Sequence, residues 1–239
     1  MINKFYRKWV VLGILFLLPV VFLLFLYPST NNYNTLDIVQ ENIHELDSLN
    51  FVDNNSTTLE SNITILNFLG DDPENKLTSV LNLKELVYDK FKGFKKFQII
   101  TISSKKSELA LKKVKKKIIQ SDELKYWFFA STNLKNYTNI FESLRSKNDL
   151  DSLNYTSQVF IVDKQKNQRG RIDDRDEDEI KNDSKLIGLY SYNSVLVSEI
   201  KKKMNDDIRI LFTEYRQKRK GNFNSNIRRL DYLDRNEKK

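Results

Sequence analysis

The side chains best placed for chemistry lie in one short segment, and the most reactive residue types are absent from it. Residues 63–77, ITILNFLGDDPENKL, predict a buried strand, a sharp loop with an Asp-Pro pair, and the start of a helix. The loop contributes three carboxylates and one amine: Asp71, Asp72, Glu74 and Lys76. The chain has no cysteine and a single histidine, His44. Chemistry through a thiolate or a disulfide is therefore excluded.

Two interpretations of this acidic loop, Asp71-Asp72-Pro73-Glu74, remain open. The aspartates can cap free N–H groups of the next helix, Pro73 suits its first turn, and negative charge favours that helix end. Alternatively, the loop is a weak site for a hard metal ion or a charged docking patch. A second acidic stretch, Asp173–Glu179, lacks the central Gly and the distal Glu of a calcium loop, and it predicts a solvated surface loop.

Other catalytic constellations are not found in the sequence. Ser157 with Tyr155 and Asp163 makes no triad, because no histidine is available as the base. No general acid–base pair and no Gly-rich phosphate loop stand out. We therefore expect no enzyme activity, no catalytic residues and no bound cofactor.

The first residues predict a membrane anchor. Residues 1–8 carry three basic side chains, and residues 9–27, WVVLGILFLLPVVFLLFLY, are uncharged. Such a run spans about 28 Å as a helix, enough to cross the hydrocarbon layer. A cleaved signal peptide is disfavoured, because the run exceeds a usual h-region of about 15 residues and no small-x-small site follows. We expect a single-pass anchor with a cytoplasmic N-terminus and, in a bacterium, a domain in the periplasm.

The formal charge of +8 raises the question of a nucleic-acid partner. The excess is concentrated in Lys105–Lys117 and Arg216–Lys220, which predict solvated helix faces. A chain exported from the cytoplasm rarely meets nucleic acid. Anionic lipid or an acidic protein partner is therefore the favoured interpretation.

Apolar runs of strand length alternate with helical patterns along the exported part, and this predicts an α/β sheet with parallel core strands. The pattern ends with a hairpin and a long helix, and among α/β folds this order favours a thioredoxin-like fold. Short strands are expected within Asn50–Glu60. The remaining strands are expected at 62–69, 95–103, 126–130, 158–163 and near 168–172, and the helices at about 77–91, 107–119, 136–144 and 194–218.

At this point the residues carry a family resemblance. The succession FVDNNSTTLE, ITILNFLGDDPENKL, FQIITISS, YWFFAS and NYTSQVFIVDKQKNQRGR resembles the SCO/SenC family in order and spacing, over about residues 46–218. The most specific segments are VFIVDKQKNQRGR and the last helix, EIKKKMNDDIRILFTEY. The resemblance implies a membrane-anchored thioredoxin-like protein. Members of that family deliver copper to, or handle thiols for, cytochrome c oxidase assembly.

The resemblance also implies where copper ligands would stand. The family uses a cysteine pair and a distant histidine, because thiolates bind Cu(I) tightly and imidazole serves both oxidation states. These positions fall on Asp72, Lys76 and Tyr155 in this chain. An acid, an ammonium and a phenol have replaced the soft ligands, so copper binding in the family's manner is expected to be absent. His44 precedes the fold and is expected to be exposed.

The domains are predicted as a cytoplasmic N-terminus (1–8), a transmembrane anchor (9–27), a tether (28–45), an SCO-type thioredoxin-like periplasmic domain (46–220) and a charged mobile tail (221–239). The predicted function is a non-catalytic binding or assembly factor with a protein partner, in the direction of respiratory oxidase maturation. Two alternatives stay open: a copper or thiol-redox accessory protein whose reactive groups come from a partner, and a weak hard-metal-binding domain.

Overall fold

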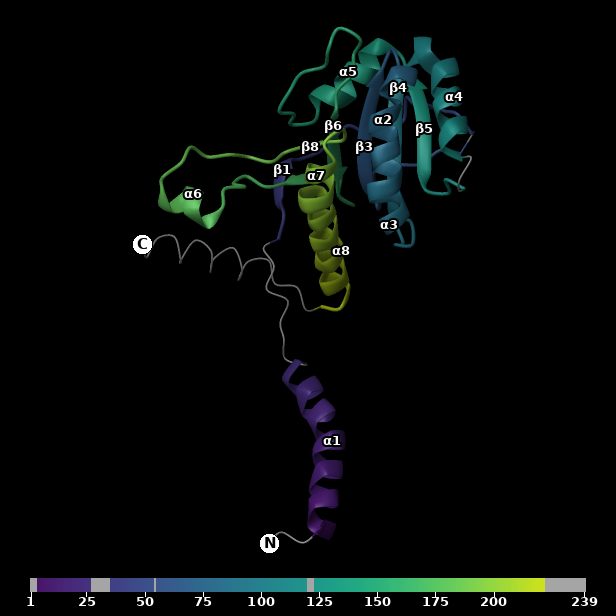
Figure 1. Cartoon of the computed structure of the whole chain (residues 1–239). Coiled ribbons are helices and arrows are strands. Elements are labelled where there is room, and N and C mark those ends of the chain that lie inside the picture. The colour runs from purple at the N-terminus through teal and green to yellow at the C-terminus, as the bar shows by residue number, and fades with distance from the viewer. Residues whose placement is uncertain (1–3, 27–34, 54, 120–122, 222–239) are drawn as a thin grey trace. The chain divides into compact units, whose positions relative to one another are not determined.

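The computed structural model describes residues 4–26, 35–53, 55–119 and 123–221 (Figure 1). The chain divides into two compact units, Met1–Asn34 and Thr35–Lys239. Most of the predicted tail, 221–239, lies outside the described residues, as do the first three residues and most of the predicted tether before Thr35.

The first unit contains helix α1, Lys4–Leu26, which has Pro19 inside it. Within it, Arg7–Phe25 has a mean hydropathy of 2.5 and is long and apolar enough to cross a membrane. A signal sequence near the N-terminus meets the same criteria of length and composition, so the helix alone does not establish a membrane span.

The second unit is built on an eight-stranded mixed sheet with the order β1-β7-β6-β3-β4-β5-β2, and β8 pairs with β6. Strand β3 is central; it is parallel to β4, which is parallel to β5, and it is antiparallel to β6. Strands β6 and β7 form an antiparallel hairpin. The strands are β1 Asp37–Gln40, β2 Asn50–Phe51, β3 Ile63–Gly70, β4 Phe97–Ser104, β5 Trp127–Thr132, β6 Gln158–Val162, β7 Gln168–Gly170 and β8 Tyr192–Asn193.

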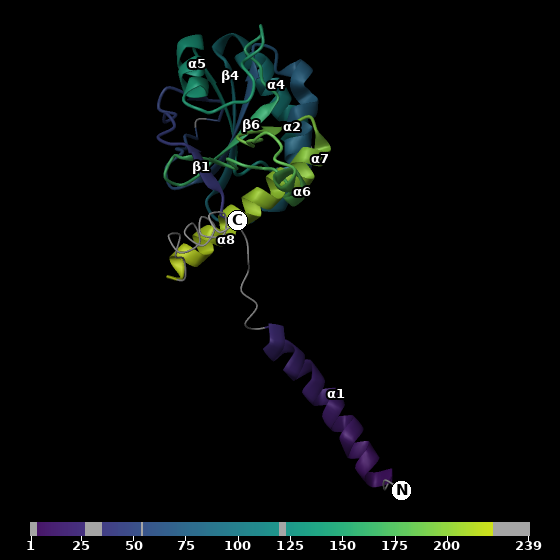
Figure 2. The ribbon, with the colours of Figure 1, turned by 90° about the vertical axis from the view of Figure 1, so that its left-hand side faces the viewer.

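Helices cover both faces of this sheet (Figures 1 and 2). One face packs against the helices that follow β3 and β4 and against the last helix, and the other packs against α5 and residues 43–59. Side chains alternate along β3, so that Ile65 belongs to the first core and Leu66 to the second. The helical segments are η1 Glu74–Lys76, α2 Leu77–Leu83, η2 Lys84–Tyr88, α3 Asp89–Phe91, η3 Lys105–Ser107, α4 Glu108–Ile119, α5 Leu134–Glu142, α6 Glu177–Lys181, α7 Val197–Glu199, η4 Ile200–Met204 and α8 Asn205–Arg219.

The predicted alternation, the parallel core strands, the hairpin and the closing helix are all confirmed. Strands β3 and β4 are buried at every residue, which explains their continuous apolar sequence. Two helices differ from the prediction, because each contains a π-helical turn: η2 follows α2 directly, and η4 lies between α7 and α8. On the helix after β3, Leu83 is buried while Leu81 faces solvent.

Part of the segment predicted as a tether belongs to the sheet. Strand β1 pairs antiparallel with β7, and the side chains of Leu36, Val39 and Ile43 are buried. His44 is exposed, and its backbone N–H donates to Ser143 Oγ at 3.3 Å. The sheet therefore includes residues that lie before the expected start of the domain at residue 46. Among the described residues of Asn50–Glu60, β2 alone joins the sheet, although more than one short strand was expected there.

Candidate functional site

The predicted site lies where the central strand β3 ends. Gly70 closes the strand with φ of +64°, and a Cβ there would lie 2.2 Å from the carbonyl oxygen of Leu153. The next N–H, of Asp71, donates to that same carbonyl at 2.8 Å. Asn154 Nδ2 donates to Asp71 Oδ2 at 3.0 Å. Glycine is needed here because the loop after β3 runs close against residues 151–155.

The acidic side chains of this loop do not cap the following helix. Pro73 is the N-cap residue of η1, and no side chain accepts a hydrogen bond there. Asp72 Oδ2 instead accepts from Asn75 Nδ2 at 2.6 Å, and Glu74 Oε1 pairs with Lys113 Nζ at 3.0 Å. The predicted capping by the aspartates is therefore wrong.

The same contacts bear on the hard-metal interpretation. Asp71, Asp72 and Glu74 each engage a different partner, so their oxygens do not converge on one point. Over the part of the chain that the structure describes, no three residues of the types His, Cys, Asp and Glu lie where they could share a metal ion. The geometry gives a loop of separately paired acids.

The resemblance puts copper ligands at the positions of Asp72, Lys76 and Tyr155, and the last two side chains are in direct contact. Lys76 Nζ sits 4.2 Å from the centroid of the Tyr155 ring, a cation–π arrangement. Burial raises the pKa of the half-buried Tyr155 phenol, more than its hydrogen bond with Ser79 lowers it, and the charge of Asp151 raises it further. Asp151 Oδ1 accepts the N–H groups of Leu153 and Tyr155, which fixes this turn. The third position, Asp72, faces Asn75.

The copper that the resemblance implies does not fit these side chains. A ligand set for Cu(I) needs thiolate or imidazole donors. Here a carboxylate is held by an amide, and an ammonium group rests on the face of a phenol ring whose raised pKa keeps it protonated. The cationic Lys76 would also repel a metal ion.

A small polar pocket opens beside the loop, at the carboxyl ends of the parallel strands. Its volume is about 200 Å³, less than the roughly 300–1,000 Å³ of most small-molecule sites. Its lining combines cations, amides and one acid: Asp71, Ser104, Lys105, Lys106, Asn133, Leu134 and Asn154.

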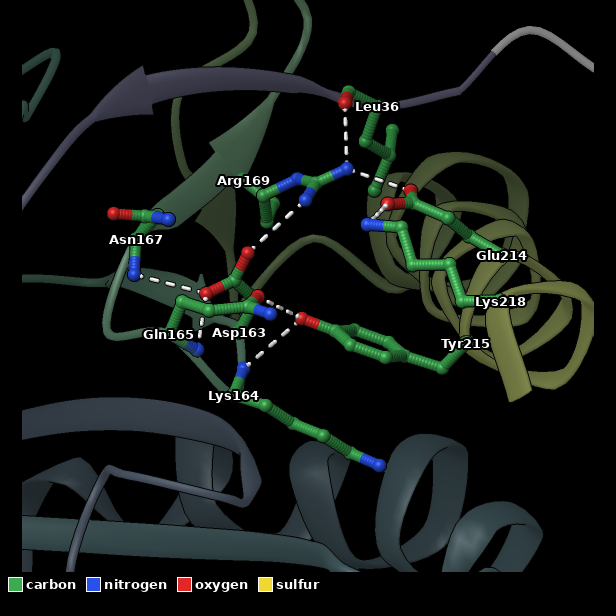
Figure 3. A network of polar contacts seen from close by, with 9 residues as sticks. All are labelled: Leu36, Asp163, Lys164, Gln165, Asn167, Arg169, Glu214, Tyr215 and Lys218. Carbon is green, nitrogen blue, oxygen red and sulfur yellow. Dashed lines mark hydrogen bonds and ion pairs between the residues drawn. The ribbon is translucent and has the colours of Figure 1, made fainter. Parts of the chain in front are cut away.

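A buried charge cluster lies on the hairpin, away from the loop (Figure 3). The Arg169 guanidinium pairs with Asp163 at 3.0 Å and with Glu214 of α8 at 2.6 Å, and it donates to the Leu36 carbonyl at 2.7 Å. The Asp163, Arg169 and Glu214 side chains are only 1%, 5% and 2% exposed. We call these three residues the hairpin cluster.

The hairpin cluster holds the sheet edge to the last helix. Asp163 Oδ1 also accepts the N–H groups of Gln165 and Asn167, at 2.9 and 3.0 Å, and thereby shapes the turn between β6 and β7. The Tyr215 hydroxyl of α8 donates to Gln165 Oε1 at 2.5 Å. In the sequence, the stretch VFIVDKQKNQRGR was singled out only for the family resemblance. An ionic role was signalled by Glu214, a charge beside the apolar face of the last helix.

No known protein family's sequence profile matches the chain, and no curated protein matches its sequence. Similar solved structures include BsSco, a member of the Sco family of cytochrome c oxidase assembly proteins, at 15% identity over 69% of this chain and 94% of that one, with a TM-score of 0.39.

Two further structures show the same level of similarity. Copper-bound ScoI from Bradyrhizobium japonicum is 14% identical over 72% of this chain and 99% of that one, with a TM-score of 0.39. A putative electron transfer protein from Aquifex aeolicus is 13% identical over 69% and 89%, with a TM-score of 0.43. The fold of this chain rests on its own strand order and pairing, which form a mixed α/β sheet with a central strand, a hairpin and a closing helix.

Proposed function

We propose that this chain is a membrane-anchored, non-catalytic protein whose thioredoxin-like domain of the Sco type serves as a binding or assembly factor. The strand order supports the fold, because β3 is central, β4 and β5 follow in parallel, and a hairpin and a helix close the domain. Helix α1 supports the anchor, and the basic residues before its apolar run favour a cytoplasmic N-terminus and a periplasmic domain.

The observation that carries this proposal is the contact between Lys76 and Tyr155. It fills the place where the resemblance puts a thiolate and an imidazole. A chain without cysteine has no thiol of its own for redox exchange or for binding Cu(I). The scaffold is kept while its reactive groups are gone, so we assign its role to binding.

An exposed apolar patch near the loop supports a protein partner. Asn82 Nδ2 of α2 donates to the carbonyls of Ser194 and Val195, at 3.0 and 3.2 Å. This contact places α2 beside a run of exposed apolar side chains. The patch consists of Leu81, Val195, Leu196 and Val197, which are 37%, 43%, 50% and 42% exposed. Exposed apolar side chains gathered in this way mark interaction sites. A partner in respiratory oxidase maturation is proposed on the resemblance alone.

Copper competition tests the silent site. The full-length protein in detergent would be titrated with Cu(I) and Cu(II) against a chelator of known affinity. We expect no stoichiometric binding at the high affinity of a thiolate site. One tightly bound copper ion per chain would overturn the proposal and favour a copper accessory protein.

Membrane pull-down tests the binding role. The wild type would be compared with Leu196→Asp and with Leu134→Asp, a matched control on α5 whose side chain is 49% exposed. We expect an oxidase assembly component to be enriched by the wild type and by the control but lost with Leu196→Asp. Equal capture by all three variants would place the interface elsewhere and contradict the assignment of the patch.

The two alternative functions lead to other outcomes. A redox accessory whose thiols come from a partner predicts that the captured protein carries a reactive cysteine pair next to this chain. A hard-metal site predicts a calcium-dependent shift in melting temperature that is lost in Asp72→Ala. The separate pairing of the three loop acids gives the second alternative no geometric support.

A further inference from the structure

Between β7 and β8 the chain leaves the domain as a projecting arm that carries α6 (Figure 1). Its two legs run antiparallel. Arg171 and Leu189 exchange both backbone hydrogen bonds, at 2.8 and 2.9 Å, and Asp174 N–H donates to the Ile187 carbonyl at 2.7 Å. We call residues 172–187 the arm.

The acidic stretch of the arm lies mostly at the surface, as its sequence predicts, but it also contains a short helix and one buried acid. The Asp174 side chain is 4% exposed, and it pairs with Arg171 at the base of the arm and with Lys203 of the last helical stretch. At the tip, Asp176 and Glu179 form a reciprocal capping box at the start of α6. The arm therefore presents its surface in a fixed arrangement.

The surface of the arm combines acids with exposed apolar side chains. Residues 172–187 contain seven acidic and three basic residues, a formal charge of −4. The exposed apolar side chains are Ile172, Ile180, Leu186 and Ile187, at 41%, 47%, 53% and 43%. Four large apolar side chains held in water on one short projection are typical of an interface, because a monomer gains nothing from exposing them.

The same chain carries a surface of complementary chemistry on α4. Residues 105–117 contain seven lysines and one glutamate, a formal charge of +6, and of these lysines Lys115 is buried and pairs with Asp53. Leu109 lies among them at 75% exposure, with Lys112 and Lys113 three and four positions along the helix. Within the described residues, Lys105 and Lys116 have no ion-pair partner. We call the exposed side chains of this segment the basic face; they are Leu109 with Lys105, Lys106, Lys113, Lys116 and Lys117.

The arm and the basic face lie at opposite ends of the domain (Figure 1), so they do not meet within one chain. Charge of opposite sign around an apolar centre favours contact between two chains. We propose that the arm of one copy docks on the basic face of a second copy, with Ile180 near Leu109. When two copies exchange this contact reciprocally, the assembly closes as a dimer.

Site-specific cross-linking tests this contact, and the lack of native cysteine leaves no background. Differently tagged full-length chains carrying Ile180→Cys and Leu109→Cys would be mixed in detergent and oxidised. The control replaces Leu109→Cys with Phe94→Cys, at 41% exposure. We expect a disulfide-linked pair of unlike chains to form several-fold faster than in the control, and more slowly at high salt. Equal rates in the two mixtures would overturn the proposal.

Charge reversal on the two surfaces provides a second, independent test. Lys116→Glu on the basic-face chain should slow the cross-link several-fold, and Asp178→Lys on the arm chain should restore part of the rate. Both side chains lie on helix surfaces, so the fold of each chain is kept. A cross-linking rate that is unchanged by both reversals would contradict docking through these surfaces.

Discussion

The loop after β3 and the hairpin cluster are both polar, but they differ in how completely their charges are enclosed. In the hairpin cluster, the side chains of Asp163, Arg169 and Glu214 are at most 5% exposed and are held by short ion pairs. At the loop, Glu74 pairs at the surface, with its side chain 36% exposed, and Lys76 only rests on a ring.

This difference indicates at which positions a substitution leaves the fold stable. A buried charge whose partner is removed costs about 3–5 kcal/mol, whereas exposed ion pairs and exposed cation–π contacts are each worth about 1 kcal/mol or less. The loop can therefore exchange its side chains without losing the fold. The hairpin cluster cannot, and it keeps the last helix attached to the sheet edge.

The largest effect is expected from Arg169→Met. It leaves the buried Asp163 carboxylate without a counter-charge and Glu214 with only the ammonium group of Lys218, so the free energy of unfolding should fall by about 3–5 kcal/mol. Denaturant unfolding of the full chain measures this loss, with Lys113→Met as the exposed control at about 1 kcal/mol or less. If Arg169→Met does not accumulate, Glu214→Gln should show a smaller loss of the same sign. A loss below that of the control would remove the contrast between the regions.

Gly70→Ala should destabilise the loop more than a change of its charged side chains does, because backbone geometry holds the loop in place. The φ of +64° and the 2.2 Å approach of a Cβ to the Leu153 carbonyl make any side chain strained there. We expect a loss of about 1–3 kcal/mol in unfolding free energy. Gly93→Ala is the matched control, since a Cβ there meets nothing within 4 Å. Equal stability of the two variants would contradict the close approach.

Lys76→Met should cost little. The substitution removes the contact with the Tyr155 ring, and contacts of this kind are worth about 0.5–1 kcal/mol at exposed sites. The melting temperature should fall by only a few degrees. A loss as large as that of Arg169→Met would show that the loop is as constrained as the cluster.

The smallest effect concerns the alkaline titration of Tyr155. Burial raises its pKa above the ordinary value of 10.0. Because the folded state keeps the proton longer than the unfolded chain, this contribution to stability is complete below pH 10.0 and is lost as the pH rises through the raised pKa. The difference in phenolate absorbance between wild type and Tyr155→Phe should appear above pH 10.0. Ionisation of Tyr155 below that pH would reverse the assignment.

The sequence predicted the central sheet well, because continuous apolar runs such as β3 and β4 carry their own signal. Strand β1 was not predicted, because its four residues are too few to show an alternation of apolar and polar side chains. It pairs with β7 only in the folded domain. Lys115 was expected in solvent, yet its side chain is 9% exposed and paired with Asp53. Charges were assumed to face water, so the hairpin cluster and the arm were also missed.

At the candidate site, local pattern placed the loop but not its contacts. The proximity of Lys76 and Tyr155 was indicated by the resemblance, since no local periodicity links residues so far apart in sequence. The orientation of Asp72 depends on Asn75, which no pattern singled out. Side-chain partners at a loop follow from the tertiary packing of both segments, and a single sequence does not encode that packing in any readable period.

The proposed function requires that Asp72, Lys76 and Tyr155 stand where a Sco-type domain would hold its soft copper ligands. Cu(I) titration of the variant Asp72→Cys, Lys76→Cys, Tyr155→His tests it most directly, with a control in which Leu153→His replaces Tyr155→His. We predict one Cu(I) per chain at high affinity in the first variant, much weaker binding in the control, and none in the wild type. A folded first variant that binds no better than the control would contradict the account.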